Sequence, residues 1–366
     1  MGSATFAARV VAWQRKHGRR DLPWQASRDP YRIWLSEVML QQTQVATVLP
    51  YFTRFVAAFP TVAALAAAPL ARVLERWSGL GYYRRAHHLH AAARAVVERH
   101  GGRFPQDAAT LATLPGIGRS TAAAIAAFAC GERGAILDGN VKRVLARHRG
   151  IDGWPGEPKV EARLWAAAET LLPREDDCAR DPATIGDYTQ GMMDLGATVC
   201  ARVRPRCDRC PVRDNCIART EARIASLPTP RPRKTLPRRA VTILLLERKG
   251  TILLEQRPPV GIWSGLWSLP ELGLDADIAA HVSSRFGVAA DSMQKLASVA
   301  HAFTHFALTM HPVRVRVNPH PCVAEVPSVA WFAIDDAIAA AIPAPIRRLL
   351  SRLAPDPTAP GQAGSS

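Results

Sequence analysis

The stretch "CARVRPRCDRCPVRDNC", residues 200–216, places four cysteines close together and puts five arginines between them. Cys200, Cys207, Cys210 and Cys216 have the spacing C-x6-C-x2-C-x5-C. Thiolates are soft ligands, so a set of four suits zinc or an iron–sulfur cluster. Zinc ribbons usually pair two C-x2-C knuckles across a longer run, whereas this loop has one knuckle and two medium spacings. We therefore predict a [4Fe–4S] cluster with one sulfur on each iron, and zinc is the alternative.

Composition and charge indicate the kind of partner. The chain has 366 residues, enough for about two domains. Its net charge of +16, from 47 Lys and Arg against 31 Asp and Glu, favours nucleic acid over a basic surface without a polyanionic partner. Residues 1–24 lack a signal-peptide core, and the chain has no apolar run of about 18 residues. We expect a cytoplasmic, nucleoid-associated protein without a membrane segment, in a reducing compartment where clustered cysteines bind metal.

The pattern of apolar residues changes along the chain. Residues 1–225 carry alanine-rich helical patterns interrupted by Pro and Gly, which predicts an all-α domain. "SLPTPRPRKTLPRR" (226–239) is typical of an extended linker with almost nothing to bury. Residues 240–353 predict an α+β domain that begins with a hairpin around Lys249 and Gly250, and residues 354–366 predict a disordered tail. Further elements of this second domain are expected as helices near 275–286 and 344–353 and strands near 296–317 and 328–333.

A glycine-rich turn precedes one alanine-rich helix. "LATLPGIGRSTAAAIAAFA" (111–129) contains Gly116 and Gly118 immediately before the helix. Glycines allow a tight turn and a close approach to a ligand, and the helix N-terminus offers free N–H groups, so the turn can bind a phosphate. An ordinary helix–turn–helix connection has the same pattern. The segment "ILDGNVKRVLAR" (136–147) follows it and strengthens the phosphate interpretation.

Two carboxylates occupy unusual positions. Glu37 lies in a mainly apolar helical segment between Trp34 and Leu40, where desolvation raises a carboxyl pKa and suits a general acid. The plain alternative is the polar edge of an amphipathic helix. Asp138 follows the apolar run "AIL" and opens a helix, where Asp is also a preferred N-cap.

The cysteine spacing, the hairpin, Asp138, "SEVMLQQTQV" (36–45) and "FTH" (303–305) together resemble the MutY-type adenine DNA glycosylases of the endonuclease III-like superfamily. The resemblance covers nearly the whole chain. It implies an all-α helix-hairpin-helix core with a [4Fe–4S] cluster and a C-terminal α+β domain of the Nudix (MutT-like) type. It also implies base-excision repair of double-stranded DNA, by removal of adenine mispaired with 8-oxoguanine or guanine.

The resemblance assigns roles to the catalytic residues. It implies that Glu37 protonates adenine N7, and that Asp138 stabilises the oxocarbenium-like sugar cation or bonds to it briefly. Asn140 helps to position Asp138 or a water. Relatives that also cut the backbone have Lys where this chain has Ser120, "GRKTA" against "GRSTA". Because serine cannot form a Schiff base, we predict a monofunctional enzyme that leaves an abasic site.

The resemblance also implies DNA contacts. Gln42 and Tyr82 match residues that wedge into the duplex when a nucleotide is flipped out, and Trp24 matches an adenine-pocket residue. The alternatives are a surface Gln, a packed Tyr and a core Trp, and for each loop arginine a solvated charge. Lys142 is either a phosphate ligand or incidental. The expected DNA-contacting residues are Trp24, Gln42, Tyr82, Gly116, Gly118, Arg202, Arg204 and Arg206.

The C-terminal domain carries two informative segments. "GIWSGLWSLPE" (261–271) is similar to MutT-like domains, but the next stretch, 272–288, has no glutamate to hold Mg²⁺, so we expect no pyrophosphate hydrolysis. In "HAFTHF" (301–306), Phe303, Thr304 and His305 match the family's Phe-Ser/Thr-His loop, which implies recognition of 8-oxoguanine. The alternative is a strand with alternating aromatic and polar residues.

Two other functions remain as alternatives. A bifunctional glycosylase and lyase acting on oxidised pyrimidines is opposed by Ser120. A non-catalytic lesion-binding protein of the same fold is opposed by the two carboxylates, Glu37 and Asp138. We expect a monomer.

Overall fold

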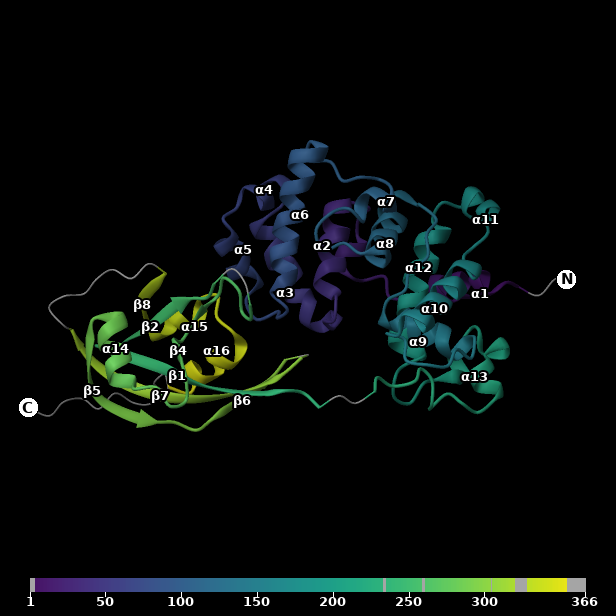
Figure 1. Cartoon of the computed structure of the whole chain (residues 1–366). Coiled ribbons are helices and arrows are strands. Elements are labelled where there is room, and N and C mark those ends of the chain that lie inside the picture. Colours follow the sequence, from purple (N-terminus) through teal and green to yellow (C-terminus); the bar gives the residue numbers. More distant parts are fainter. Residues whose placement is uncertain (1–3, 233–234, 259–260, 304, 320–327, 354–366) are drawn as a thin grey trace, which may run out of the picture. The chain divides into compact units, whose positions relative to one another are not determined.

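The computed structural model describes the chain apart from residues 1–3, 233–234, 259–260, 304, 320–327 and 354–366. It divides into two compact units (Figure 1). The first unit takes in residues 1–68 and 87–233, and the second takes in residues 69–86 and 234–366. Predicted Thr304 and the predicted tail lie outside the described residues.

All the secondary-structure elements in the described part of the first unit are helices, as predicted, and loops connect them. None of the described helices is both long and apolar enough to cross a membrane. The helices are α1 (Phe6–His17), η1 (Pro23–Gln25), α2 (Pro30–Leu40), α3 (Val45–Ala58), α4 (Val62–Ala67), α6 (Arg84–His100), α7 (Ala108–Leu111), α8 (Arg119–Cys130), α9 (Gly139–His148), α10 (Pro158–Thr170), α11 (Glu175–Arg180), α12 (Thr184–Asp194), η2 (Leu195–Val199), η3 (Cys207–Arg209), η4 (Arg213–Asn215) and α13 (Ile217–Thr220).

Local sequence signals set several helix ends. The Thr5 hydroxyl accepts a hydrogen bond from the Ala8 amide at 3.2 Å and caps α1. Asp29 caps α2, with Pro30 in the first helical position, where its missing N–H costs nothing. Helix α8 ends at Gly131, whose φ of 73° favours glycine.

Helix α8 is the centre of the first unit. Its residues from Ala122 to Ala127 are all buried, and it packs against α2, α7 and α12. Five of these six residues are alanine, and such short side chains let neighbouring helices lie close to the axis of α8. The hairpin turn that precedes α8 is therefore attached to a rigid element.

The second unit is built on a mixed eight-stranded sheet. Strands β3, β2, β1, β7 and β5 are neighbours in that order, and β1 and β7 run parallel. Its strands are β1 (Arg238–Arg248), β2 (Thr251–Gln256), β3 (Trp267–Ser268), β4 (Glu271–Leu272), β5 (Val288–Lys295), β6 (Val299–Ala302), β7 (Ala307–Pro319) and β8 (Val329–Ala333). Its helices are α5 (Leu70–Trp77), α14 (Ile278–Phe286), α15 (Ile334–Ala339) and α16 (Ala344–Ser351).

The run "ILLL" in β1 is apolar because both faces of the sheet are covered. Ile243 and Leu245 pack in one cluster with residues of α15 and α16, whereas Leu244 and Leu246 pack in another with residues of α14. Successive side chains of a strand point to opposite faces, so a strand covered on both sides reads as a continuous apolar run.

The hairpin predicted around Lys249 is present. Arg248 pairs with Thr251, and Lys249 and Gly250 both have positive φ, 45° and 76°, as a two-residue hairpin turn requires. Strand β5 and helix α15 were not predicted, since "VAADSMQK" has no clean alternation and "IDDAIA" is too short to show a helical period.

The predicted linker is more ordered at its start than its composition suggests. Leu227 is buried, and its carbonyl accepts a hydrogen bond from Arg147 Nε at 2.8 Å. Thr229 Oγ1 accepts another from the Gly153 amide at 3.1 Å. At the other end, β1 begins at Arg238, inside the predicted linker. The segment between these ends is therefore shorter than 226–239.

Candidate active site

The glycine turn before α8 has the shape that the sequence predicted. Gly116 has a φ of 78°, and a Cβ there would lie 2.6 Å from His88 Cβ, so only glycine fits. A Cβ on Gly118 would meet no described atom within 4 Å. Gly118 is the N-cap of α8 and supplies no side-chain cap, so the first amides of the helix can bind a ligand. Phosphate binding here stays a prediction.

Ser120 connects α8 to the segment that carries Asp138. Its hydroxyl oxygen accepts a hydrogen bond from the Leu137 amide at 2.9 Å, and Leu137 immediately precedes Asp138. The predicted site residue Ser120 therefore has a positioning contact of its own. Lys142, the nearby amine, instead pairs with Glu161 at 2.6 Å.

Asp138 is both a helix cap and a partly buried carboxylate. Its Oδ1 accepts a hydrogen bond from the Val141 amide at 2.7 Å and caps α9. Burial raises the pKa of Asp138, while the amides of Val141 and Asn140 and the charge of Arg143 lower it. These donors favour the anion in a site that otherwise disfavours charge.

Arg143 joins the active-site segment to the cysteine loop. Its Nη2 donates to Asn140 Oδ1 at 2.8 Å and to the Gly196 carbonyl at 2.7 Å, and its Nε donates to the Cys200 carbonyl at 2.8 Å. A Cβ on Gly196 would come within 2.6 Å of Asn140 Cβ, so this approach needs glycine. The sequence reasoning missed Arg143.

Arg147, one turn later on α9, was also missed. It is buried, and its Nη1 lies 3.4 Å from Cys200 Sγ and 2.8 Å from the Ala201 carbonyl. Cys216 Sγ in turn lies 3.6 Å from the Arg147 carbonyl. The spacing of Arg143 and Arg147, four residues apart on the helix that Asp138 opens, was the available signal.

The four cysteines lie near one another in the first unit. Burial, with a smaller contribution from the charges of Cys200, Cys216 and Cys207, raises the pKa of Cys210 to about 12. All four are free thiols. Across the described ranges, no group of three or more His, Cys, Asp or Glu side chains has the arrangement of a metal-ion site. As a donor set, four partly buried thiols with a guanidinium against one sulfur fit an anionic thiolate cluster.

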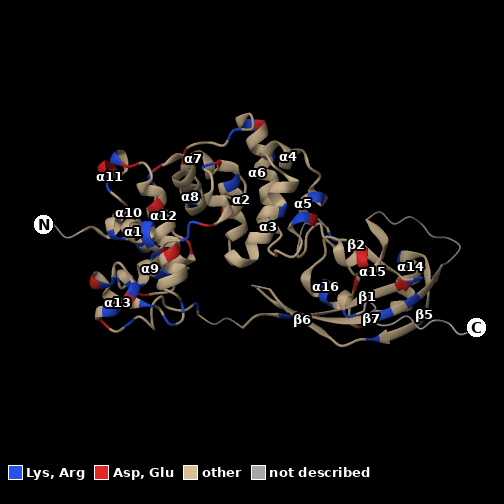
Figure 2. Ribbon diagram, turned by 180° about the vertical axis from the view of Figure 1, so that it is seen from behind, with Lys and Arg blue, Asp and Glu red and all other residues tan. Residues whose placement is uncertain are grey.

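The three predicted loop arginines differ in their surroundings. Arg202 and Arg204 are exposed, and Arg204 has a φ of 51°. Arg206 is also exposed, but its guanidinium donates to the Thr198 carbonyl. Figure 2 shows basic residues gathered around α13 and the loop before it. Arg202 and Arg204 are therefore better placed than Arg206 to bind an external phosphate.

Glu37 lines a cavity of about 670 Å³ in the first unit. Burial raises the pKa of Glu37 to about 8, and the negative charge of Asp138 contributes. The structure thus brings the two predicted carboxylates within electrostatic reach of each other, although Asp138 is not among the residues that line the cavity. A carboxyl group with this pKa is protonated at neutral pH and can act as a general acid.

Trp24 and polar groups complete this cavity. Trp24 is buried and packs edge-on against Phe52, with 5.3 Å between the ring centres, so it is a core residue and a cavity wall at once. Arg20, Gln25 and Gln190 also line the cavity. The sequence reasoning did not single them out, because polar residues on amphipathic helices are ordinarily solvated.

The two predicted wedge residues are exposed, and both have a left-handed backbone conformation. Gln42, in the first unit, has a φ of 57° and is exposed. Tyr82, in the second unit, has a φ of 48° and is 51% exposed. Left-handed conformations are uncommon for residues other than glycine and concentrate at functional sites. Their insertion into DNA stays a prediction.

The predicted lesion loop forms part of an aromatic cluster in the second unit. The Phe303 ring stacks on Phe306 and meets His301 edge-on, both at 4.6 Å between ring centres. The Trp263 ring lies 5.5 Å from that of Phe303 and 5.9 Å from that of His301. The Phe303 amide donates to the Phe306 carbonyl at 2.8 Å, and His305 is exposed. Phe303 is thus partly buried, and His305 is the residue open to a ligand.

Comparisons with known proteins cover both units. Residues 35–170 match the HhH-GPD superfamily of base excision DNA repair proteins, and residues 241–352 match the NUDIX domain family. The adenine DNA glycosylase of Buchnera aphidicola subsp. Acyrthosiphon pisum is 33% identical over 94% of this chain and 96% of its own length. The human adenine DNA glycosylase is 33% identical over 94% of this chain and 73% of its own length. The structure of a thermostable thymine-DNA glycosylase is similar to 59% of this chain and 95% of its own, with 29% identity and a TM-score of 0.50.

Proposed function

The chain belongs to the adenine DNA glycosylases, enzymes of base-excision repair, and we propose that it removes adenine mispaired with 8-oxoguanine or guanine. Its partner is DNA, and the mispair is the proposed refinement. The observation that carries the proposal is Glu37, whose pKa is raised to about 8 in a cavity of about 670 Å³. Purine excision needs this acid, because the departing base leaves more easily once a ring nitrogen is protonated.

In the proposed mechanism, adenine is flipped out of the duplex into the cavity. Gln42 and Tyr82 fill the gap left in the stack, and Trp24 packs against the base. Glu37, protonated at neutral pH, donates its proton to adenine N7. The C1′–N9 bond then breaks, and positive charge develops on the sugar.

Asp138 stabilises that charge as an anion. The amides of Val141 and Asn140 and the charge of Arg143 favour its ionised form. Ser120 fixes the preceding residue, Leu137, through its 2.9 Å hydrogen bond. Water adds to the sugar cation, either directly or after a brief bond to Asp138. The product is an abasic site, since Ser120 offers no amine and Lys142 is paired with Glu161.

We propose that Cys200, Cys207, Cys210 and Cys216 hold a [4Fe–4S] cluster, with zinc as the alternative. The four cysteines would hold this group as thiolates, and it would supply a structural cross-link that closes the loop. Arg143 and Arg147 hold this loop against α9, the helix that Asp138 caps. The loop in turn presents Arg202 and Arg204 to phosphates.

In the second unit, we propose that the 301–306 loop recognises 8-oxoguanine opposite the target adenine. Phe303 is supported by Trp263, His301 and Phe306, and His305 is exposed to form hydrogen bonds. Helix α14, "IAAHVSSRF", carries no carboxylate for Mg²⁺, which fits recognition better than hydrolysis. The proposed enzyme is a cytoplasmic monomer.

The test is single-turnover excision on duplexes with adenine opposite 8-oxoguanine, guanine or thymine, and on a duplex with an oxidised pyrimidine. Each product is analysed with and without alkali. Adenine release from the two mispairs alone, with strand breaks only after alkali, is expected. Pyrimidine release with breaks before alkali would establish the bifunctional lyase instead, and tight binding without release would establish the non-catalytic reader.

A further inference from the structure

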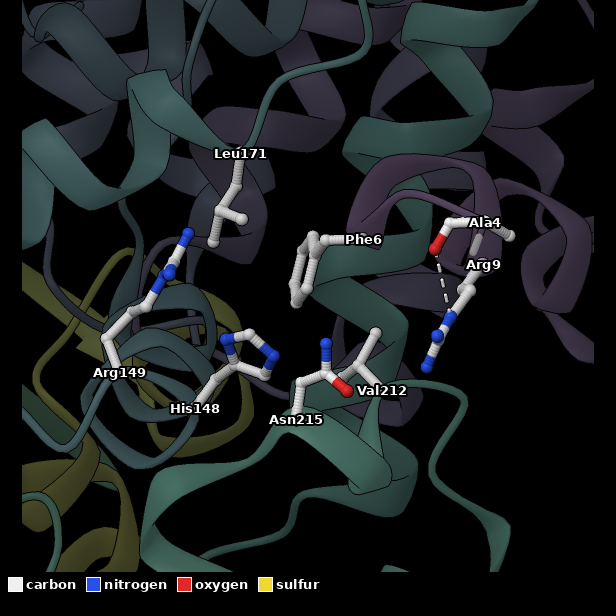
Figure 3. Close-up of a pocket in the computed structure, with 8 residues that line it drawn as sticks. All are labelled: Ala4, Phe6, Arg9, His148, Arg149, Leu171, Val212 and Asn215. Atoms are coloured by element: carbon white, nitrogen blue, oxygen red, sulfur yellow. Dashed lines mark hydrogen bonds between the residues drawn. The ribbon is translucent and has the colours of Figure 1, made fainter. Parts of the chain in front are cut away.

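A second cavity, of about 250 Å³, lies away from Glu37, where α1 begins, α9 ends and the cysteine loop passes (Figure 3). Phe6, Leu171 and Val212 form its apolar walls. Arg9, His148, Arg149 and Asn215 supply its polar groups. The excision mechanism uses none of these residues.

His148 is the buried polar group of this cavity. It is 6% exposed, and its Nδ1 is buried without a hydrogen-bond partner among the described residues. The Phe6 ring meets the imidazole edge-on at 4.7 Å and fixes its orientation. A buried polar atom without a partner is costly and rare in folded proteins, and here it marks a polar side chain at the wall of an otherwise apolar cavity.

Two guanidinium groups bring positive charge to the same cavity. In Figure 3, Arg149 and Arg9 reach it from opposite sides of the Phe6–His148 pair. Burial lowers the pKa of His148 to about 4, and the charges of Arg149 and Arg9 both contribute. Their fields therefore converge on the imidazole, which stays neutral at pH 7.

Other charges and helix ends also lie near the cavity. Arg9 donates to the Ala4 carbonyl at 3.2 Å and lies 3.7 Å from Asp214, whose side chain is 65% exposed. The pair is long and open to solvent on the Asp214 side, so solvent screening weakens it. Helix α1, twelve residues long, directs its positive end here. The negative end of α9 also lies here, but Arg149 follows it directly.

We propose that this cavity binds a phosphate-bearing anion, with Arg9 and Arg149 on its charged oxygens and His148 and Asn215 as hydrogen-bond partners. Because two guanidinium groups line the cavity, a group with two linked phosphates, which carries more negative charge, is favoured over a single phosphate. Because Val212 and Asn215 belong to the segment between Cys210 and Cys216, bound anion also fastens the cysteine loop to α1 and α9.

The experiment is a calorimetric titration of the full chain with pyrophosphate and with inorganic phosphate at constant ionic strength. We expect one site per chain, with pyrophosphate bound more tightly. Arg9→Gln and Arg149→Gln each weaken binding about tenfold, since each removes a charge-assisted hydrogen bond. The matched control is Arg94→Gln, which removes an exposed arginine of α6 that pairs with Glu98.

A second variant separates the cavity from general charge. Asp214→Asn removes the carboxylate beside Arg9, so pyrophosphate binding stays equal or becomes tighter. Thermal unfolding without anion verifies that each variant folds. Equal weakening by Arg94→Gln, unchanged binding in both cavity variants, or no binding at about 1 mM pyrophosphate would overturn the proposal.

Undamaged duplex DNA identifies the source of the phosphate. If duplex displaces pyrophosphate, and Arg149→Gln lowers the salt dependence of duplex binding by about one phosphate contact, the ligand is the DNA backbone. If pyrophosphate stays bound in the presence of duplex, the ligand is a free small phosphate. Both outcomes support the site, and neither depends on which mispair the enzyme excises.

Discussion

The segment around Asp138 and the loop around Phe303 are held in different ways. Ser120, the α9 cap and Arg143 fix the first segment by hydrogen bonds among partly buried groups. The second is organised by stacked rings and leaves His305 exposed. Breaking a glycosidic bond needs a fixed anion and a carboxyl group that burial keeps protonated, whereas recognising a base on the opposite strand needs accessible groups. The comparison predicts that excision and the proposed recognition can be separated by mutation.

The largest effect is expected from Glu37→Gln. The variant keeps the shape of the side chain but removes the proton donor, so single-turnover excision should fall about 10²–10⁴-fold. Binding to a mispaired duplex should be retained. Glu98→Gln, at an exposed position of α6, is the matched control and should excise normally. An active Glu37→Gln variant would remove the acid from the mechanism.

Asp138→Asn tests whether the residue is only a helix cap. Asn is as good an N-cap as Asp, so the melting temperature should change little. The negative charge is lost, so excision should fall about 10²–10³-fold, as for other preorganised electrostatic groups. If excision and stability stay at the wild-type level, Asp138 is a cap and nothing more.

The sequence predicted these two carboxylates for different reasons. Asp138 stood at a recognisable helix start, and Glu37 was polar in an apolar segment. The effect of the Asp138 charge on the pKa of Glu37 could not be predicted from the sequence. It depends on the packing of α2 against α8 and on the position of the segment before α9. Arg143 and Arg147 were missed for the same reason: on one helix they look like ordinary basic residues.

A smaller effect is expected in the aromatic loop. His305→Ala should reduce the preference for adenine opposite 8-oxoguanine over adenine opposite guanine by about tenfold, the value of one or two hydrogen bonds. Excision opposite guanine should stay within about twofold, because the first unit is intact. Met293→Ala, an exposed position on β5, is the control. Equal loss on both duplexes would contradict a separate recognition role.

The C-terminal domain was predicted best where a local turn decides the structure. The hairpin at Lys249 and Gly250 follows from turn chemistry alone, and the apolar run of β1 marks a strand covered on both faces. The parallel pairing of β1 with β7 joins residues about seventy positions apart, beyond any local pattern. The aromatic cluster around Phe303 depends on that pairing and on Trp263. The sequence therefore shows the aromatic residues themselves but not that their rings are in contact.

The smallest effect is expected from Ser120→Ala. Losing the hydrogen bond to the Leu137 amide should lower excision about three- to tenfold, with a small loss of stability, as for a single buried hydrogen bond. Ser120→Thr keeps the hydroxyl and should restore most of the activity. Failure of threonine to rescue, in a variant that melts normally, would show that the hydroxyl does not position Asp138.

The most direct test of the central claim is the pH dependence of single-turnover excision. With a Glu37 pKa of about 8, the acid is protonated below that pH and lost above it. The rate constant should therefore be level from about pH 6 to pH 8 and fall about tenfold per pH unit above it. The low residual rate of Glu37→Gln should lack this fall. A wild-type rate that stays level to about pH 9.5, or that falls from about pH 5, would contradict a buried, protonated Glu37 as the catalytic acid.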